Sequence, residues 1–195
     1  LKKEFVNELR NFDSPLQGHP DRLRLPEVGA STGALGQGLS MSIGRAIGKT
    51  KKNQSGYSYC IIGDGESQEG QIWEAAMYAA ANKVDNLIAT IDFNGRQIDG
   101  DVEDVLSLGS LSEKWQAFGW EVLEMDGHNF ENIHSTMTEA KNKVGHGKPV
   151  VIIMSTEMGM GVDFMMGTHK WHGVAPNDEQ LSSALSQLKE TLGDY

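Results

Sequence analysis

Four short apolar runs, separated by stretches with helical spacing, constrain the fold of this chain more than any other feature. The runs cover residues 57–62, 87–91, 120–125 and 150–155, and turn residues bound each of them. Apolar runs of this length are typical of buried strands in a parallel sheet. Around them, apolar residues recur at helical spacing in residues 39–47, 72–80, 111–118, 133–144 and 181–192. This alternation predicts an α/β fold: a doubly wound parallel sheet with helices on both faces.

The composition favours a single globular domain over residues 1–195. Apolar residues make up 38% of the 195 positions and charged residues 23%, and no linker interrupts the pattern. A stretch of about 18 apolar residues, as a membrane span requires, is absent from the sequence, so we expect no membrane association. The chain begins with Leu1, and a short helical pattern at Phe5 and Leu9 leads directly into a loop. We therefore expect the domain to be incomplete at its amino end.

The net charge and the cysteine content limit which functions and which cellular compartments are expected. The formal net charge is −10 and no basic stripe is present, which argues against nucleic-acid binding, since that affinity depends on phosphate neutralisation. Cys60 is the single cysteine, so no internal disulfide can form. This cysteine usage is compatible with a reducing cytoplasm, where we expect the protein.

The strongest chemical motif is Gly63-Asp64-Gly65, followed at the end of the next predicted strand by Asn94. Because ligands of open α/β sheets bind at the carboxyl ends of the strands, both segments are expected at one rim of the sheet. A carboxylate, an amide oxygen and a backbone carbonyl form an oxygen-rich partial shell that suits Mg²⁺ or Ca²⁺. The alternative is a pair of ordinary turns in which Asp64 caps the following helix.

Two further segments contain candidate functional residues. Glycines at positions 33, 36 and 38 could cradle a phosphate at a helix start or merely permit a tight turn, and His19 precedes them in a Gly-His-Pro sequence. Near the carboxyl end, His169 and His172 flank Lys170-Trp171. The two histidines lack the further partners that a zinc site needs, so zinc is disfavoured. On residue type alone, His19 and His169 are ordinary loop histidines.

Taken in order, Gly-His-Pro, Leu-Gly-Gln-Gly, Gly-Asp-Gly…Asn and Trp-His-Gly resemble the transketolase family, from about residue 16 to residue 195. The resemblance implies thiamine diphosphate bound through Mg²⁺ or Ca²⁺. It implies that Asp64 and Asn94 ligate the metal by side chain and that Arg96 does so by its main-chain carbonyl. The positions implied to contact the cofactor are Gly33, Ala34, Leu35, Gly63, Gly65, Glu69, Asn94 and His172.

The same resemblance assigns other roles. It implies that His19 and His172 act on the substrate, and imidazole suits proton transfer near neutral pH. Leu35 would lie against the cofactor rings. Glu69 and Glu74 would lie at an interface between polypeptides that links two active centres, although residue type alone indicates only a solvated helical face.

The implied reaction moves a two-carbon ketol unit from a ketose phosphate to an aldose phosphate, as in the pentose phosphate pathway. In this family the activating glutamate belongs to a separate pyrimidine-binding domain, and two further active-site histidines lie upstream of the matched region. We therefore expect the amino-terminal subunit of a split transketolase, which is inactive without a pyrimidine-binding carboxyl-terminal subunit. When active, it should be at least dimeric. Three alternatives remain: another thiamine diphosphate enzyme, such as a deoxyxylulose phosphate synthase; a non-catalytic cofactor-binding module; and a plain nucleotide-binding domain, whose glycine fingerprint is missing.

Overall fold

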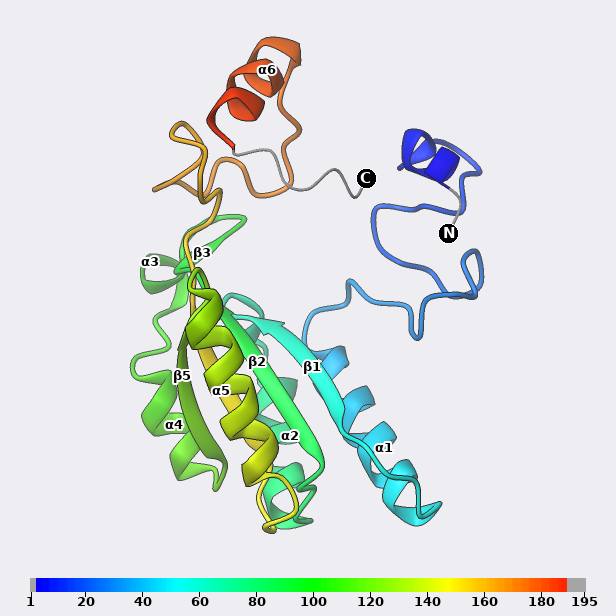
Figure 1. Ribbon diagram of the computed structural model, residues 1–195, viewed down its shortest axis with the longest axis vertical. Coiled ribbons are helices and arrows are strands. Elements are labelled where there is room, and N and C mark those ends of the chain that lie inside the picture. Colours follow the sequence, from blue (N-terminus) through cyan, green and yellow to red (C-terminus); the bar gives the residue numbers. More distant parts are fainter. Residues whose placement is uncertain (1–2, 189–195) are drawn as a thin grey trace.

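The structure is a computed structural model that describes residues 3–188, and a four-stranded parallel sheet lies at its centre (Figure 1). The strands are β1 (Ser58–Gly63), β2 (Leu87–Phe93), β5 (Glu121–Asp126) and β6 (Val150–Ser155). They are ordered β1-β2-β6-β5, and each neighbouring pair is parallel. The predicted strands are confirmed to within one or two residues at each end. The apolar runs thus located the strands well.

Five longer helices accompany the sheet, as the helical spacing predicted. They are α1 (Gln37–Lys51), α2 (Gly70–Ala81), α4 (Leu111–Ala117), α5 (Phe130–Lys143) and α6 (Asp178–Gln187). Within residues 3–188, none of the helices combines the length and the apolar character that a membrane crossing needs.

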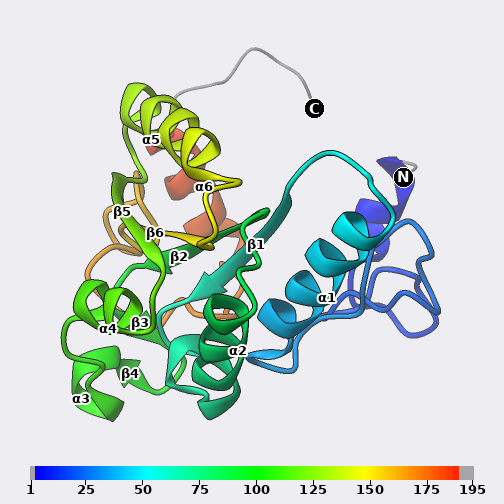
Figure 2. The same ribbon diagram turned by 90° about the horizontal axis from the view of Figure 1, so that it is seen from below.

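Helices lie on both faces of the sheet, with α5 on one face and α1, α2 and α4 on the other (Figure 2). Alternate residues along a strand belong to the two layers. In β2, Leu87, Ala89 and Ile91 pack with α1, α2 and α4, whereas Ile88 packs with α5. The same alternation holds in β6. Val151 and Ile153 belong to the larger apolar cluster, on the face with α1, α2 and α4, and Val150 and Ile152 belong to the smaller cluster, on the face with α5. Because successive side chains of a strand point to opposite faces, this two-sided burial confirms the doubly wound α/β fold.

The two edge strands, β1 and β5, depart from the prediction that every apolar run is buried throughout, and in β5 only Met125 is buried. The departure is larger in β1. Cys60 and Ile62 face α1 and α2, but Tyr59 and Ile61 on the other face are 51% and 77% exposed. The physical reason is the position of β1 at the edge of the sheet, since the cluster beneath α5 takes its strand residues from β2, β5 and β6. One face of β1 is therefore not covered by the described residues.

The two ends of the chain also differ from the sequence pattern. Phe5 lies in a 3-10 helix, Lys3–Glu8, rather than in a regular α-helix, and Leu9 follows it. The predicted helix over 181–192 is α6, which begins earlier, at Asp178, because Asn177 caps it. Its expected final residue, Leu192, lies outside the described residues.

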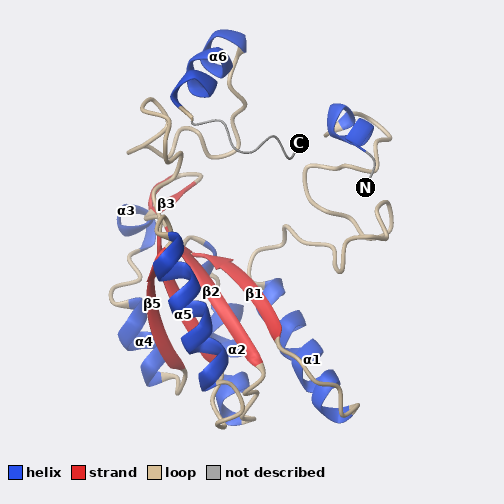
Figure 3. Cartoon of the chain, viewed as in Figure 1, coloured by secondary structure: helices blue, strands red, loops and turns tan. Residues whose placement is uncertain are grey.

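Long loops flank the carboxyl ends of the strands (Figure 3). The amino-terminal segment up to residue 36 and the segment from residue 156 to 177 both lack α-helix and strand in the part of the chain that the structure describes. Figure 1 places the amino-terminal segment and α6 beyond the end of the sheet where β6 finishes. Small elements that the sequence did not predict lie at the same end: η2 (Glu66–Gln68), β3 (Arg96–Gln97), β4 (Gly100–Asp101) and α3 (Val102–Leu106).

Candidate functional site

The Gly-Asp-Gly motif and the segment around Asn94 are in direct contact. Strands β1 and β2 are adjacent and parallel, with Gly63 in register with Asp92, so both motifs leave the sheet at one edge. Asp64 Oδ2 accepts a hydrogen bond from the Gly95 amide at 2.6 Å, and the Asp64 amide donates to the Asp92 carbonyl at 3.1 Å. The expected common rim is therefore present, and one backbone hydrogen bond and one bond to the Asp64 side chain fix its geometry.

Asp64 is a buried carboxylate, with 1% of the residue exposed. Burial raises its pKa, the amides of Gly95 and Gly65 oppose that rise, and the nearby Asp92 adds to it. The Gly65 amide donates to Asp64 Oδ1 at 2.7 Å. Among residues 3–188, no lysine, arginine or histidine forms an ion pair with Asp64. A buried carboxylate in this setting favours a bound cation, since an unpaired buried charge is costly.

The alternative in which Asp64 caps the following helix is wrong. Gly65 holds the cap position of η2, and Glu69 holds that of α2. The Asp64 carboxylate bonds to its neighbour Gly65 and to Gly95, which lies beyond the next strand. Its role is therefore to join two loops rather than to begin a helix.

Asn94 and Arg96 lie beside this carboxylate. Asn94 Oδ1 accepts from the Arg96 amide at 2.8 Å, and Asn94 Nδ2 lies 3.4 Å from Asp92 Oδ2. The guanidinium of Arg96 forms an ion pair with Asp101 on β4. This contact occupies the Arg96 side chain, so only the main chain of Arg96 is suited to a role at the site.

A cavity of about 240 Å³ collects most of the predicted site residues. Its lining consists of Leu35, Gly63, Asp64, Gly65, Glu66, Asp92, Asn94, Arg96, Gln97, Ile98 and His172. A neighbouring cavity of about 500 Å³ shares Leu35 and Glu66 with it and includes Gly33 and Ala34. The tertiary structure thus brings together residues from four separate stretches of the sequence.

Glu66 is one residue of this site to which sequence reasoning gave no role. Its carboxylate accepts from the Gly36 amide at 2.7 Å and from the Gly63 amide at 3.1 Å. Glu66 therefore holds the glycine-rich loop against the Gly-Asp-Gly loop. An acidic residue directly after a tight turn was the available signal, because such a side chain can reach free backbone amides.

Two glycines allow these loops to pack closely against neighbouring elements, Gly36 against α2 and Gly65 against β3. Gly36 has φ +83°, and a Cβ at this position would lie 2.5 Å from Gln71 Cγ. A Cβ at Gly65 would lie 2.8 Å from the Cβ of Gln97. The Gly65 amide, expected to meet a diphosphate, donates to Asp64 in this structure. The glycines therefore serve loop packing whether or not a phosphate is bound.

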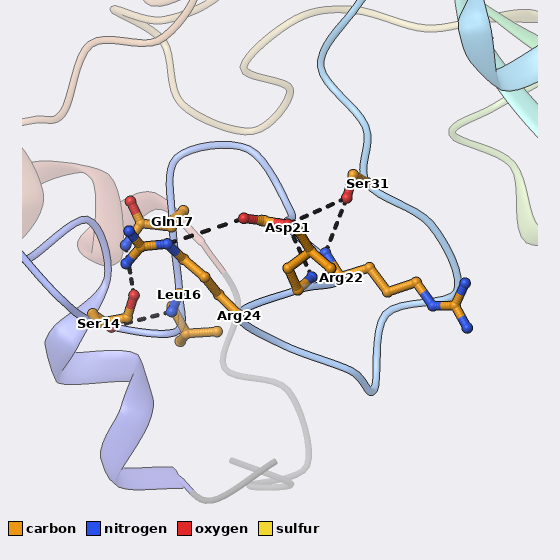
Figure 4. A network of polar contacts seen from close by, with 8 residues as sticks. Ser14, Leu16, Gln17, Asp21, Arg22, Arg24 and Ser31 are labelled. Atoms are coloured by element: carbon orange, nitrogen blue, oxygen red, sulfur yellow. Dashed lines mark hydrogen bonds and ion pairs between the residues drawn. The ribbon is translucent and has the colours of Figure 1, made fainter.

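His19 lies outside the cavity that contains Asp64. It lines a separate cavity of about 470 Å³ and packs on Gly33, where an added Cβ would lie 2.6 Å from His19 Cγ. The loop after His19 is held by Asp21 and Ser31 (Figure 4). Ser31 Oγ accepts from the Arg22 amide at 3.0 Å, and Asp21 Oδ1 accepts from the Leu23 amide at 2.9 Å. The structure thus connects His19 to the glycine-rich loop but not directly to the Asp64 rim.

His172 reaches the cavity from the long segment after β6. The amide of His172 donates to the His169 carbonyl at 2.9 Å, and Trp171 Nε1 donates to the Phe164 carbonyl at 2.9 Å. The Trp171 and Phe164 rings are 5.3 Å apart. These contacts fold the segment back on itself and set the position of His172.

Glu69, directly before α2, and Glu74, within α2, are both exposed. Neither belongs to the lining of the cavity that contains Asp64. Glu69 occupies the cap position of α2 but makes no side-chain cap hydrogen bond. Their surroundings in the described part of the chain are those of solvated acids.

The described residues include no group of three or more His, Cys, Asp or Glu side chains placed to hold a metal. An ion at this rim would need one carboxylate, an amide oxygen, a main-chain carbonyl and oxygens from a further ligand. The residues present fit that description, because Asp64 is buried without a cationic partner among residues 3–188 and hard cations prefer oxygen ligands.

The family model that matches residues 1–193 is "Transketolase, thiamine diphosphate binding domain". The chain belongs to this transketolase family. The resemblance seen in the ordered motifs is thereby confirmed, as is its consequence that the chain is of the transketolase type, a transferase.

Curated relatives are longer than this chain. One component of the apulose-4-phosphate transketolase of Phocaeicola vulgatus is 41% identical over 194 residues, which is 98% of this chain and 67% of that protein. The 6-deoxy-6-sulfo-D-fructose transketolase subunit SqwG of a Clostridium species is 39% identical, covering 96% and 67%. The transketolase of Homo sapiens is 35% identical, covering 87% of this chain and 26% of the human protein. The chain thus spans about two thirds of the two bacterial proteins and about a quarter of the human one.

Solved transketolase structures share the fold of this chain. The transketolase of Campylobacter jejuni superposes with a TM-score of 0.86 at 33% identity, covering 94% of this chain and 29% of that one. The transketolase of Leishmania mexicana gives a TM-score of 0.87 at 29% identity, covering 95% and 29%. The sheet and its helices are therefore those of a transketolase cofactor domain.

Proposed function

We propose that this chain is the thiamine diphosphate- and Mg²⁺-binding subunit of a two-subunit transketolase. In this proposal it transfers a two-carbon ketol unit from a ketose phosphate to an aldose phosphate, together with a pyrimidine-binding subunit. The family match supports the cofactor class. The observation that carries the metal is the buried Asp64 carboxylate beside Asn94 and the main chain of Arg96.

Each predicted residue has a role in the proposal. Asp64 and Asn94 would hold the metal by side chain and Arg96 by its carbonyl. The surrounding cavity residues would bind the cofactor, and they are Gly33, Ala34, Leu35, Gly63, Gly65 and His172. The position of Leu35, which lines both cavities with 53% of its surface exposed, supports an apolar contact with a ring. Glu69 is proposed to act only through a second polypeptide, because it lies outside both linings.

When bound, thiamine diphosphate supplies a nucleophilic ring carbon that can take up a two-carbon unit and release it to an acceptor. The protein's contribution is position and proton transfer. His172, exposed at the cavity edge, would bind substrate oxygens and hold or move a proton there. His19 would do the same from the glycine-rich loop, to which its ring is packed.

The names of the relatives support the proposal of a partner subunit. Two of them are named as transketolase subunits, so we propose that residues 1–195 act as a single domain with a separate pyrimidine-binding subunit. The active form would be at least a dimer, located in the cytoplasm. Its substrates would be sugar phosphates, either of the pentose phosphate pathway or of the kinds named for those relatives.

The test is reconstitution. The full chain is mixed with its pyrimidine-binding subunit, thiamine diphosphate and Mg²⁺, and two-carbon transfer from a ketose phosphate is assayed. Activity in the mixture, and in neither polypeptide alone, is the expected result. Cofactor binding without transfer for any ketose phosphate would indicate a non-catalytic binding module instead.

The metal ligands are tested by calorimetry on the same mixture. Asp64→Ala is expected to lose metal-dependent cofactor binding, because it removes the only charged ligand proposed for the ion. Asp104→Ala, an exposed acid on α3, is the matched control and should bind as the unmodified chain does. Unchanged binding by Asp64→Ala would show that the ligand assignment is wrong.

A further inference from the structure

Asp92 is an acidic residue at the site to which neither the sequence motifs nor the proposed ligand set gives a role. It lies near the end of β2, opposite Met154 of β6, and lines the cavity that contains Asp64. Its two carboxylate oxygens contact two different side chains. Oδ1 accepts from the hydroxyl of Thr156, and Oδ2 lies 3.4 Å from Asn94 Nδ2.

The contact with Asn94, together with the bond from the Arg96 amide, fixes which way the Asn94 amide faces. A carboxylate accepts hydrogen bonds, so the NH₂ group of Asn94 turns toward Asp92 and the amide oxygen turns away from it. That oxygen accepts from the Arg96 amide at 2.8 Å, on the side where the main chain of Arg96 lies. A cation binds an asparagine side chain through its oxygen. If the amide were turned the other way, its NH₂ group would face the cation instead.

Thr156 in turn fixes Asp92. It is the first residue after β6, and its amide donates to the Phe93 carbonyl at 3.2 Å. Its hydroxyl donates to Asp92 Oδ1. Thr156 is therefore held by the sheet through its backbone and holds the carboxylate through its side chain. A carboxylate with one oxygen engaged in this way has little freedom to rotate away from Asn94.

We propose that Asp92, held by Thr156, is a positioning residue that orients the Asn94 amide oxygen toward the metal. This inference rests on the proposed function, because it requires Asn94 to be a metal ligand. Hydrogen bonds from neighbouring residues to a metal-binding side chain set the orientation of that side chain, and removing one such bond typically lowers metal affinity by about 10- to 100-fold. Asp92 acts here through Asn94 and does not itself touch the metal.

The first test replaces the Thr156 hydroxyl. Thr156→Val keeps the shape of the side chain and removes the donor, and Thr156→Ser keeps the donor. Mg²⁺ affinity is measured by calorimetry with thiamine diphosphate and the pyrimidine-binding subunit present. We expect about a tenfold loss for Thr156→Val and an affinity close to that of the unmodified chain for Thr156→Ser. Thr138→Val on α5, whose hydroxyl donates to the His134 carbonyl of the same helix, controls for the substitution itself.

The second test is a double-mutant cycle between Asp92→Asn and Asn94→Ala. If Asp92 acts through Asn94, Asp92→Asn lowers Mg²⁺ affinity in the unmodified chain and has little further effect beside Asn94→Ala. An equal loss in both backgrounds would mean that the Asp92 charge attracts the ion directly, and it would overturn the positioning role. Thermal unfolding of each variant, followed by circular dichroism, separates affinity changes from misfolding.

The outcomes distinguish this inference from the proposed function. If the unmodified mixture binds no Mg²⁺ with thiamine diphosphate, the proposed function fails and the positioning role fails with it. If Mg²⁺ binds in an Asp64-dependent way but Thr156→Val matches Thr138→Val, the proposed function stands and the role of Asp92 and Thr156 is wrong. A loss for Thr156→Val and Asp92→Asn that is absent from Thr138→Val and Thr156→Ser, and that disappears beside Asn94→Ala, supports the positioning role.

Discussion

Gly36 shows how a single residue holds two loops of the site together. It has φ +83°, occupies the cap position of α1 and donates its amide to Glu66. A side chain here would be strained in the backbone and would collide with Gln71. The absence of a Cβ at position 36 therefore lets the glycine-rich loop pack against α2 while its amide bonds to Glu66.

We expect Gly36→Ala to lower the free energy of unfolding by about 1–3 kcal/mol, because a non-glycine residue is forced into a left-handed conformation. Gly48→Ala is the matched control. Gly48 lies inside α1 with no atom near its Cβ position, so alanine should raise stability by up to about 1 kcal/mol. Urea unfolding of both variants measures the difference. Equal effects at the two positions would contradict the proposed role of Gly36.

Cys60 provides a residue-level test that depends on pH. Burial raises the pKa of the Cys60 thiol; a hydrogen bond with Ser42 opposes the rise, and the charge of Glu66 adds to it. Because the folded pKa lies above the unfolded one, the associated stability is present below the unfolded pKa. That stability is lost as the pH rises through the folded pKa.

We therefore expect the native chain to react slowly with iodoacetamide near neutral pH and faster only above the usual range of a thiol. The thiolate is the reacting species, and burial disfavours it. The urea-unfolded chain is the control and should react with ordinary thiol kinetics. Since the chain has one cysteine, mass spectrometry reads this site alone. Equal rates for folded and unfolded chains near neutral pH would refute the prediction.

Among the helices, α6 begins at a position that its own capping residues define. Asn177 Oδ1 accepts from the Gln180 amide at 2.8 Å, and Gln180 Oε1 accepts from the Asn177 amide at 2.9 Å. This reciprocal pair is a capping box, which satisfies two amides that a helix start leaves free. Ala184 is the buried residue of the described helix. Local capping therefore contributes a large part of the stability of α6.

Asn177→Ala is expected to destabilise α6 by about 1 kcal/mol, the usual cost of losing a side-chain cap. Because few of its residues are buried, the loss should appear as local opening rather than global unfolding. Amide hydrogen exchange of residues 181–187 measures it. Ser182→Ala, an exposed change inside α6, is the control and should leave exchange unchanged or slower. Faster exchange in both variants would show that the cap is not responsible.

The whole molecule depends on an aromatic centre in the larger of its two apolar clusters. Trp115 of α4 is fully buried, with its ring centre 5.4 Å from that of Trp73 on α2 and 4.8 Å from that of Trp120 before β5. The Trp120 indole N–H donates to the Ala76 carbonyl at 3.0 Å. The buried Nε1 of Trp115 has no hydrogen-bond partner within the described residues. Trp115 thus contributes through packing, which links α2, α4 and the sheet.

Trp115→Ala should lower the free energy of unfolding by about 3–5 kcal/mol, the usual cost of removing a large buried ring. Trp115→Phe should cost clearly less, because it retains most of the ring and leaves no unpaired N–H. Urea unfolding followed by circular dichroism measures both. Leu185→Ala, at a side chain that is 61% exposed, is the control and should change stability by about 0.5 kcal/mol or less. A larger loss for Trp115→Phe than for Trp115→Ala would contradict this account.

Local pattern determined the class of fold and the identity of the site loops. Apolar runs mark β2 and β6 because these central strands fill the sheet interior, and glycines mark the loops because close packing of the backbone excludes side chains. The same pattern overestimated the burial of the edge strands β1 and β5, since strand order cannot be read from a run of apolar residues. The prediction of thiamine diphosphate as the cofactor came from the resemblance to a family, not from residue spacing.

Only the tertiary structure decided how the site fits together. Glu66 and Asp92 acquire their contacts from residues about 30 and 64 positions away, which no local pattern reveals. His172 is brought to the cavity by a segment that is tied down at Glu157, whose amide donates to His128 at 2.8 Å. The physical reason is that hydrogen bonds form between whatever groups the packed sheet places side by side. Sequence alone determined which loops would meet at the rim, and packing decided which side chains hold them there.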